Sequence, residues 1–241
     1  LMARRDDAAA AEQFHTAIAR KPDHDQARLN LGMLAERAGR PDEARAWYLD
    51  ALRVKPGFAN AHYNLGRLAT VQGNPDGAIA HYQRAIKLDS THDEAMTNLG
   101  VLFAERGDAE RAVALYRRAL EVNPMSVAAH VNLGNVYLNA NRLDEALAEW
   151  GKAVALQPGN AVVPNNIGVV LLAQGKLDEA ERRFRESLAV RPDYVDALIN
   201  LGAVRARRGD AAGARQYLAK ALAVDPRNAK ARSQLDALNA R

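Results

Sequence analysis

The sequence predicts an all-α fold, an α-solenoid in which helix-turn-helix repeats stack one on the next. An Asn-Leu-Gly or Asn-Ile-Gly triplet recurs every 34 residues without insertion or deletion. An alanine followed four residues later by an aromatic residue, or by leucine in the last copy, recurs in the same phase. Proline, or serine once, closes each copy. Self-similarity at a fixed period of this length is the signature of a stacked repeat array.

These residues resemble a known repeat family. The period, together with Gly100, Phe103, Ala112, Tyr116 and Pro124, is similar to the tetratricopeptide repeat over nearly the whole chain. The resemblance implies a right-handed superhelix whose concave face is formed by the first helix of each repeat, helix A. We assign a half repeat at 1–24, repeats at 25–58, 59–92, 93–126, 127–160, 161–194 and 195–228, and a capping helix at 229–241.

Residues 1–24 are predicted to form the tail of one helix and a complete second helix. Ala10, Phe14 and Pro22 fall in phase with the later repeats, whereas most of the helix before them is absent. We therefore expect the chain to begin within a longer array, and this half repeat to be less stable than the rest.

Each complete repeat contains helix A, a tight turn and helix B. Apolar periodicity predicts the buried stripe of helix A, for example Ala95, Leu99, Leu102 and Arg106 in repeat 93–126. Gly100 leaves room for helix B to pack closely. Gly107 ends helix A in the left-handed conformation, as do Gly39, Gly73, Gly175 and Gly209, with Asn141 in the equivalent place. Acidic residues then favour the start of helix B at Asp42, Asp76, Asp144 and Asp178.

Two repeats depart from this pattern. Pro164 falls in the first turn of a helix A and is expected to shorten it slightly. In repeat 195–228, Arg205 replaces an apolar residue and Leu218 replaces the ring, which predicts a weakened edge. Asp236 then stands where every complete repeat has glycine, so residues 229–241 are expected to cap the array.

Composition excludes several classes of partner. The 33 basic and 29 acidic residues give a net charge of +4 and are spread over every repeat, so we predict no nucleic-acid binding. No apolar run approaches the roughly 18 residues that cross a bilayer, so no membrane insertion is predicted. The absence of cysteine excludes disulfides and cysteine-bound metals but leaves the cellular compartment open.

The sequence offers no pattern typical of catalysis. None of the six histidines stands three or four residues from another, so no two can share a metal on one helix turn. Acidic and basic residues at four-residue spacing, as at Glu179 and Arg183 or Glu181 and Arg185, indicate surface ion pairs. No phosphate-binding glycine loop or nucleophile motif occurs. We therefore predict neither an enzyme nor a site for a metal or cofactor.

One face of helix A remains as a binding surface, because the same position is Asn in all six repeats. An amide both donates and accepts, so a row of Asn can hold peptide backbone of any sequence. Such a row resembles the asparagine ladder in the tetratricopeptide arm of O-linked N-acetylglucosamine transferases. We expect these side chains to point away from the core, although bonds to their own helix or the next repeat are an alternative. The candidate peptide-binding residues are Asn30, Asn64, Asn98, Asn132, Asn166, Asn200, Arg67, Glu94, Asn135, Asn165, Val131 and Val169.

The sequence thus predicts a non-catalytic scaffold that holds a protein or extended peptide segment on its concave face. Two alternatives stay open. In the first alternative, the array is the substrate-recognition arm of a larger enzyme, such as a protein glycosyltransferase. In the second, it is a structural repeat domain that associates with a second copy through its edge. The family's clamp for a C-terminal carboxylate is disfavoured, because no repeat has Lys in the position before the recurring Asn.

Overall fold

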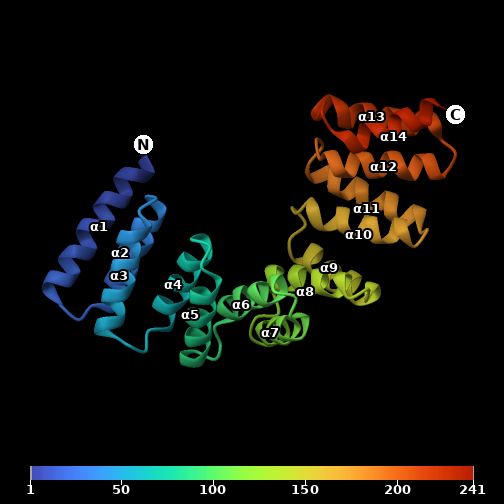
Figure 1. Cartoon of the computed structure of the whole chain (residues 1–241). Coiled ribbons are helices and arrows are strands. Elements are labelled where there is room, and N and C mark those ends of the chain that lie inside the picture. The colour runs from blue at the N-terminus through green and yellow to red at the C-terminus, as the bar shows by residue number, and fades with distance from the viewer. Residues whose placement is uncertain (1, 241) are drawn as a thin grey trace. The chain divides into compact units, whose positions relative to one another are not determined.

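The structure is a computed structural model that describes residues 2–240, with side chains from residue 7 onward. These residues form 14 α-helices and no strand. Short turns join the helices into consecutive hairpins, as Figure 1 shows. The chain is therefore an all-α solenoid of helix-turn-helix repeats, which confirms the predicted fold class.

The helices fall into two compact units. Unit 1 ends at Pro124 and holds α1 (Met2–Arg20), α2 (Asp25–Arg37), α3 (Pro41–Val54), α4 (Ala59–Val71), α5 (Pro75–Leu88), α6 (Asp93–Glu105) and α7 (Ala109–Val122). Unit 2 begins at Met125 and holds α8 (Val127–Asn139), α9 (Leu143–Leu156), α10 (Val162–Ala173), α11 (Leu177–Val190), α12 (Val195–Arg207), α13 (Ala211–Val224) and α14 (Ala229–Asn239).

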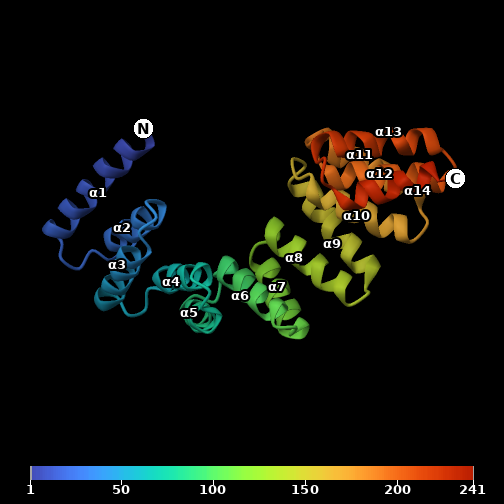
Figure 2. The same cartoon turned by 45° about the horizontal axis from the view of Figure 1, so that its top comes forward.

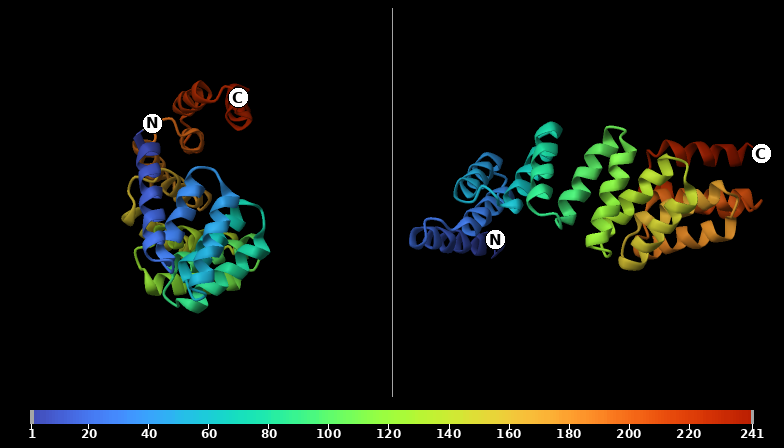
Figure 3. Two further views of the ribbon diagram at one scale, coloured as in Figure 1. Left: turned by 90° about the vertical axis from the view of Figure 1, so that its left-hand side faces the viewer. Right: turned by 90° about the horizontal axis from the view of Figure 1, so that it is seen from below.

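Packing within each unit alternates along the chain. Helix A of a repeat packs most extensively on its own helix B, as α4 does on α5 and α12 on α13. Helix B then contacts helix A of the next repeat, as α5 contacts α6 and α11 contacts α12. These neighbouring pairs can be followed by their colours in Figures 2 and 3. Contacts in each unit are therefore made chiefly between neighbours in sequence, as in a one-dimensional array.

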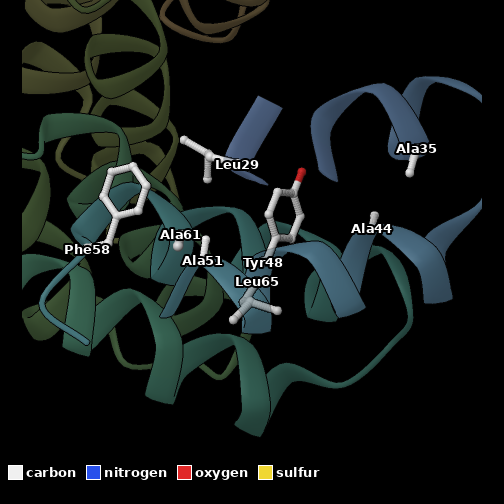
Figure 4. Close-up of a cluster of buried hydrophobic side chains, with 8 residues drawn as sticks. All are labelled: Leu29, Ala35, Ala44, Tyr48, Ala51, Phe58, Ala61 and Leu65. Atoms are coloured by element: carbon white, nitrogen blue, oxygen red, sulfur yellow. The ribbon is translucent and has the colours of Figure 1, made fainter. Parts of the chain in front are cut away.

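The core of each repeat is one large side chain of helix B seated on a glycine of helix A. Tyr116 is 1% exposed, and a Cβ built on Gly100 would lie 2.6 Å from the Cε1 atom of that ring. The same arrangement joins Gly134 to Trp150 and Gly32 to Tyr48. Figure 4 shows the Tyr48 ring among side chains from α2, α3 and α4. The recurring glycine is required because any larger residue would displace the ring.

The turn between helix A and helix B depends on left-handed backbone. The five glycines at this turn have φ between 69° and 79°, and Asn141, at the equivalent position, has φ 57°. Other L-residues rarely adopt this conformation because Cβ crowds the following carbonyl oxygen. The predicted acidic residues follow, with Asp144 and Asp178 in the first turns of α9 and α11.

We expect Gly175→Ala to destabilise unit 2 by roughly 1–2 kcal/mol, the cost of placing an L-residue in left-handed backbone. A new Cβ there would meet no atom within 4 Å, so the loss would be conformational rather than steric. Gly159→Ala is the matched control, because Gly159 is also open but has no positive φ. Urea unfolding of both variants measures the difference, and equal midpoints would contradict the conformational argument.

The N-terminal segment differs from the prediction. Residues 2–20 form one continuous helix, so the predicted break between the tail of one helix and a second helix is wrong. The residue 34 positions before Gly39 is Arg5, and no glycine or asparagine stands there to end the first helix. The helix therefore continues through the point where the later repeats turn.

Two further details of helix A were tested by the structure. The helix with Pro164, α10, has 12 residues where α8 and α12 have 13, which confirms the slight shortening. Arg106 was wrongly placed on the buried stripe, because it is the C-cap of α6 and its side chain is exposed. The stripe ends one turn earlier, at Leu102.

The last complete repeat is not simply a weakened edge. Leu218 is 1% exposed and fills the place of the ring, while Arg205 pairs with the buried Glu181 at 2.6 Å. Glu181 also contacts Arg185 and Arg208 at 2.6 Å. This ionic cluster joins α11 to α12 and takes the role of the apolar side chain that Arg205 replaces. Of the two predicted four-residue pairs, Glu181 and Arg185 meet, whereas Arg183 pairs with Glu186.

Candidate functional site

The row of Asn on helix A is less open than the sequence predicts. Asn64 and Asn200 are buried, with exposed fractions of 5% and 7%, so the expectation that all six point away from the core is wrong for these two. The other four, Asn30, Asn98, Asn132 and Asn166, are half-buried. Neighbouring helices therefore cover much of this row in both units.

Part of the hydrogen-bonding capacity of the row is used inside the protein. Asn200 Nδ2 donates to Asn165 Oδ1 at 3.0 Å, which joins α12 to α10. Arg67 donates to Asn64 Oδ1 at 3.4 Å. In the same helix as Asn30, Gln26 Nε2 donates to Asn30 Oδ1 at 3.1 Å. The alternative of bonds to the same helix or the next repeat is therefore observed, although an amide has further donor and acceptor sites beyond each of these bonds.

Unit 1 contains a hollow of about 840 Å³ between α1, α2 and α4. Among its lining residues are Asn30 and Arg67 of the predicted set, which the structure brings together. Met33 and Val71 face the same hollow and are 43% and 86% exposed. The complete lining is Ala10, Phe14, Asn30, Met33, Leu34, Glu36, Arg37, Gly39, Pro41, Arg67, Leu68 and Val71. We call this feature the unit 1 hollow.

Polar groups of fixed position stand in the wall of the unit 1 hollow. Glu36 Oε2 accepts a hydrogen bond from the Tyr48 hydroxyl at 2.7 Å and lies 3.9 Å from Arg67 Nη1. Burial and the neighbouring Glu36 raise the pKa of Tyr48 above its ordinary value. The hydroxyl is therefore a donor over an even wider pH range than that of a free tyrosine. The core of the repeat thus anchors Glu36, and Glu36 attracts the partly exposed Arg67. The wall combines apolar surface with one anion, Glu36, and two cations, Arg67 and Arg37, of which Arg37 also pairs with Asp7.

The remaining predicted residues are spread over separate places. Glu94 is exposed and lies 3.3 Å from the Nδ1 atom of His92 in unit 1. In unit 2, Val169 is exposed and Asn135 is half-buried. Val131 is half-buried, and its carbonyl accepts a hydrogen bond from Trp150 Nε1 at 3.2 Å.

Asn165 does not fit the predicted role of a ligand contact. It is only 5% exposed, and its amide is engaged with Asn166 as well as Asn200. We therefore interpret Asn165 as a bridge between α10 and α12 rather than as part of an open surface.

Sequence reasoning missed histidine contacts that run between two helices. His62 and His81 bring their Nδ1 atoms to 3.2 Å, and His130 Nδ1 lies 2.6 Å from Glu149 Oε2. Burial alone would raise the pKa of Glu149, but hydrogen bonds from Lys152 and His130 hold it below its usual range. Both pairs join residues 19 positions apart, one on helix A and one on helix B. The 19-residue spacing is the sequence signal for a contact across the hairpin. A search limited to pairs on one helix turn could not detect it.

Within residues 2–240, none of the helices has the combination of length and hydropathy that a membrane span needs.

Comparison with solved structures agrees with this architecture. PilF of Pseudomonas aeruginosa is similar with a TM-score of 0.76 and 19% identity, covering 87% of this chain and 95% of that one. YrrB, described as a tetratricopeptide protein with an unusual peptide-binding site, has a TM-score of 0.63 and 24% identity. That match covers 78% of this chain and 97% of the YrrB chain. A chain of the APC/C hetero-tetramer Cut9-Hcn1 has a TM-score of 0.73 and 18% identity, and the match covers 96% of this chain and 46% of that chain. This chain therefore spans less than half the length of that relative. At these identities the likeness shows the fold alone.

No curated protein matches the sequence. Two family models do match, and both are described as tetratricopeptide repeat. One covers residues 1–57 and 94–161, and the other covers 57–124 and 159–227. The sequence period, the glycine-and-ring core and these matches agree, and the chain belongs to the tetratricopeptide repeat family.

Proposed function

We propose that the chain is a non-catalytic scaffold that binds an extended segment of another protein, and that the unit 1 hollow receives part of that segment. The observation that carries the proposal is the meeting of Asn30 and Arg67 with the exposed side chains of Met33 and Val71 around one concave space. Concave sites with an apolar lining and a few fixed polar groups are where proteins usually bind ligands.

Each group in the hollow suits a different part of a peptide. Met33 and Val71 offer apolar surface for a hydrophobic side chain, and the flexible thioether of Met adapts to varied shapes. The Asn30 amide has both donor and acceptor sites for backbone. Arg67, whose side chain is 44% exposed, is suited to a carboxylate of the ligand. We therefore expect a preference for segments in which an apolar residue stands near an acidic one.

The neighbours support a binding role without identifying the ligand. YrrB is described as having a peptide-binding site, and Cut9 is part of a hetero-tetramer, although both share only the fold with this chain. Neither matched family model is described as an enzyme family. The same surface would serve a free-standing adaptor or the recognition arm of a larger enzyme. In both cases these repeats would bind a protein segment and catalyse no reaction themselves.

Panning a random peptide library against the chain, followed by affinity measurement on the Asn30→Ala, Arg67→Ala double variant, tests the proposal. A net hydrogen bond contributes about 0.5–1.5 kcal/mol, so we expect the loss of two to weaken binding by roughly ten-fold or more. Gln83→Ala, on the exposed surface of α5, is the matched control and should keep wild-type affinity. A double variant that retains its melting temperature and binds the selected peptides as tightly as the wild type would exclude the hollow as the binding site.

A further inference from the structure

His62 and His81 form a pair of imidazoles that the peptide-binding proposal does not use. His62 lies in the first turns of α4 and His81 lies near the middle of α5, and these helices form one repeat of unit 1. Both side chains are half-buried. Their Nδ1 atoms lie 3.2 Å apart, with ring centroids 5.5 Å apart and planes inclined at 35°.

The distance between the two nitrogens suits a shared metal ion. Zinc binds imidazole nitrogen at about 2.0–2.1 Å, and two such bonds at the tetrahedral angle place the nitrogens about 3.3–3.4 Å apart. The observed 3.2 Å is close to this spacing. The centroid separation of 5.5 Å shows that the two nitrogens meet nearly head-on, so both rings have to turn for their lone pairs to point at one ion. Without a metal, the same distance is bridged by one proton, donated from one ring to the lone pair of the other.

The surroundings hold the rings in a state that can bind a cation. Burial lowers the pKa of both rings, and His81 and Arg84 lower the pKa of His62 further. The nearby Pro56 backbone acts to raise the pKa of the His62 ring, but the net shift is downward. Both imidazoles are therefore neutral at pH 7, as metal ligation requires. His81 also lines a hollow of about 260 Å³ with residues of α3, α4 and α5.

We infer that His62 and His81 form a binding site for a divalent transition-metal ion of the zinc class, held between helix A and helix B of the repeat 59–92. Among the described residues, no third His, Asp or Glu joins this pair. The protein thus supplies two nitrogen ligands, and water or a carboxylate or imidazole of a bound protein completes the coordination shell. Because the ion would link two helices in the folded state only, its binding would stabilise unit 1.

Zinc chloride added to the metal-free chain at pH 7, followed by isothermal titration calorimetry, tests this site. We expect one ion per chain and a rise in the melting temperature with zinc concentration. His62→Gln and His81→Gln should each weaken zinc binding at least ten-fold and abolish that rise. His15→Gln removes a histidine of α1 instead and should bind zinc as the wild type does.

Circular dichroism of each variant separates a missing ligand from a failure to fold. If a variant unfolds, electron paramagnetic resonance of the wild type with Cu²⁺ provides the independent measurement, and it should report two nitrogen ligands. The inference fails if the wild type does not bind zinc, if folded His62→Gln and His81→Gln bind it as tightly as the wild type, or if the Cu²⁺ spectrum shows fewer than two nitrogens. This test is independent of any peptide ligand.

Discussion

Tyr116→Ala is expected to destabilise the repeats around α7 by roughly 3–5 kcal/mol, the usual cost of truncating a buried ring. Tyr116 is almost fully enclosed, and Gly100 lies against its edge. Removing the ring leaves a cavity whose walls belong to the helices of this hairpin. Those walls cannot collapse without moving the hairpin. The loss of stability therefore includes both the free energy of burying the ring and the cost of the cavity that remains.

The damage should be local. Because each repeat of unit 1 contacts chiefly its neighbours, hydrogen exchange should rise most in α6 and α7 and less in α2 and α3. Tyr116→Phe keeps the ring and is the matched control, with little expected change. Uniform loosening of all the repeats in unit 1 by Tyr116→Ala would contradict the one-dimensional description.

Glu181→Gln should destabilise unit 2 by roughly 1–3 kcal/mol, less than a fully buried ion pair because the arginine partners are partly exposed. The carboxylate of Glu181 is the common partner of Arg185, Arg205 and Arg208. Without it, three cations remain close together and the neutral amide compensates none of them, while Asp210 stays 3.5 Å from Arg205 and Asp178 stays in contact with Arg208. The substitution keeps the shape of the side chain, so the effect reports charge.

Urea unfolding at low and high salt measures this effect. The loss should be smaller at high salt, because salt screens the repulsion among the arginines. Glu179→Gln, an exposed position on the same helix, is the control and should change stability by less than about 0.5 kcal/mol. If both variants are equally stable, the ionic cluster does not compensate for the absence of an apolar side chain at Arg205.

The regular part of the fold could be predicted because each requirement recurs in sequence. Gly100 and Tyr116 stand 16 residues apart, and the same spacing repeats at Gly134 and Trp150. Left-handed backbone at the turn restricts the residue type to Gly or Asn, so helix ends can be located without a structure. The continuous α1 was missed because the phase of the repeat was extended over a segment that lacks this turn residue.

The site was harder to predict because it depends on side-chain direction rather than on spacing. Every Asn of the row occupies the same position, yet Asn64 is buried beside Arg67 and Asn30 borders an open hollow. Contacts between helices were missed for a related reason. Arg106 pairs with Asp76, 30 residues earlier and in the preceding repeat, and His62 meets His81 across the hairpin. Such partners are distant in sequence, and only the packed helices bring them together.

The central proposal is that a peptide occupies the unit 1 hollow, and the methionines of the chain are natural reporters of it. Of the four, Met33 lines the hollow, Met96 is fully buried and Met125 is exposed outside it. With ¹³C-labelled methionine methyl groups, titration with a selected peptide should shift the Met33 resonance, assigned from Met33→Leu, and leave Met96 and Met125 almost unchanged. Saturable binding of the same peptide with an unshifted Met33 resonance would contradict the account and place the ligand on another surface.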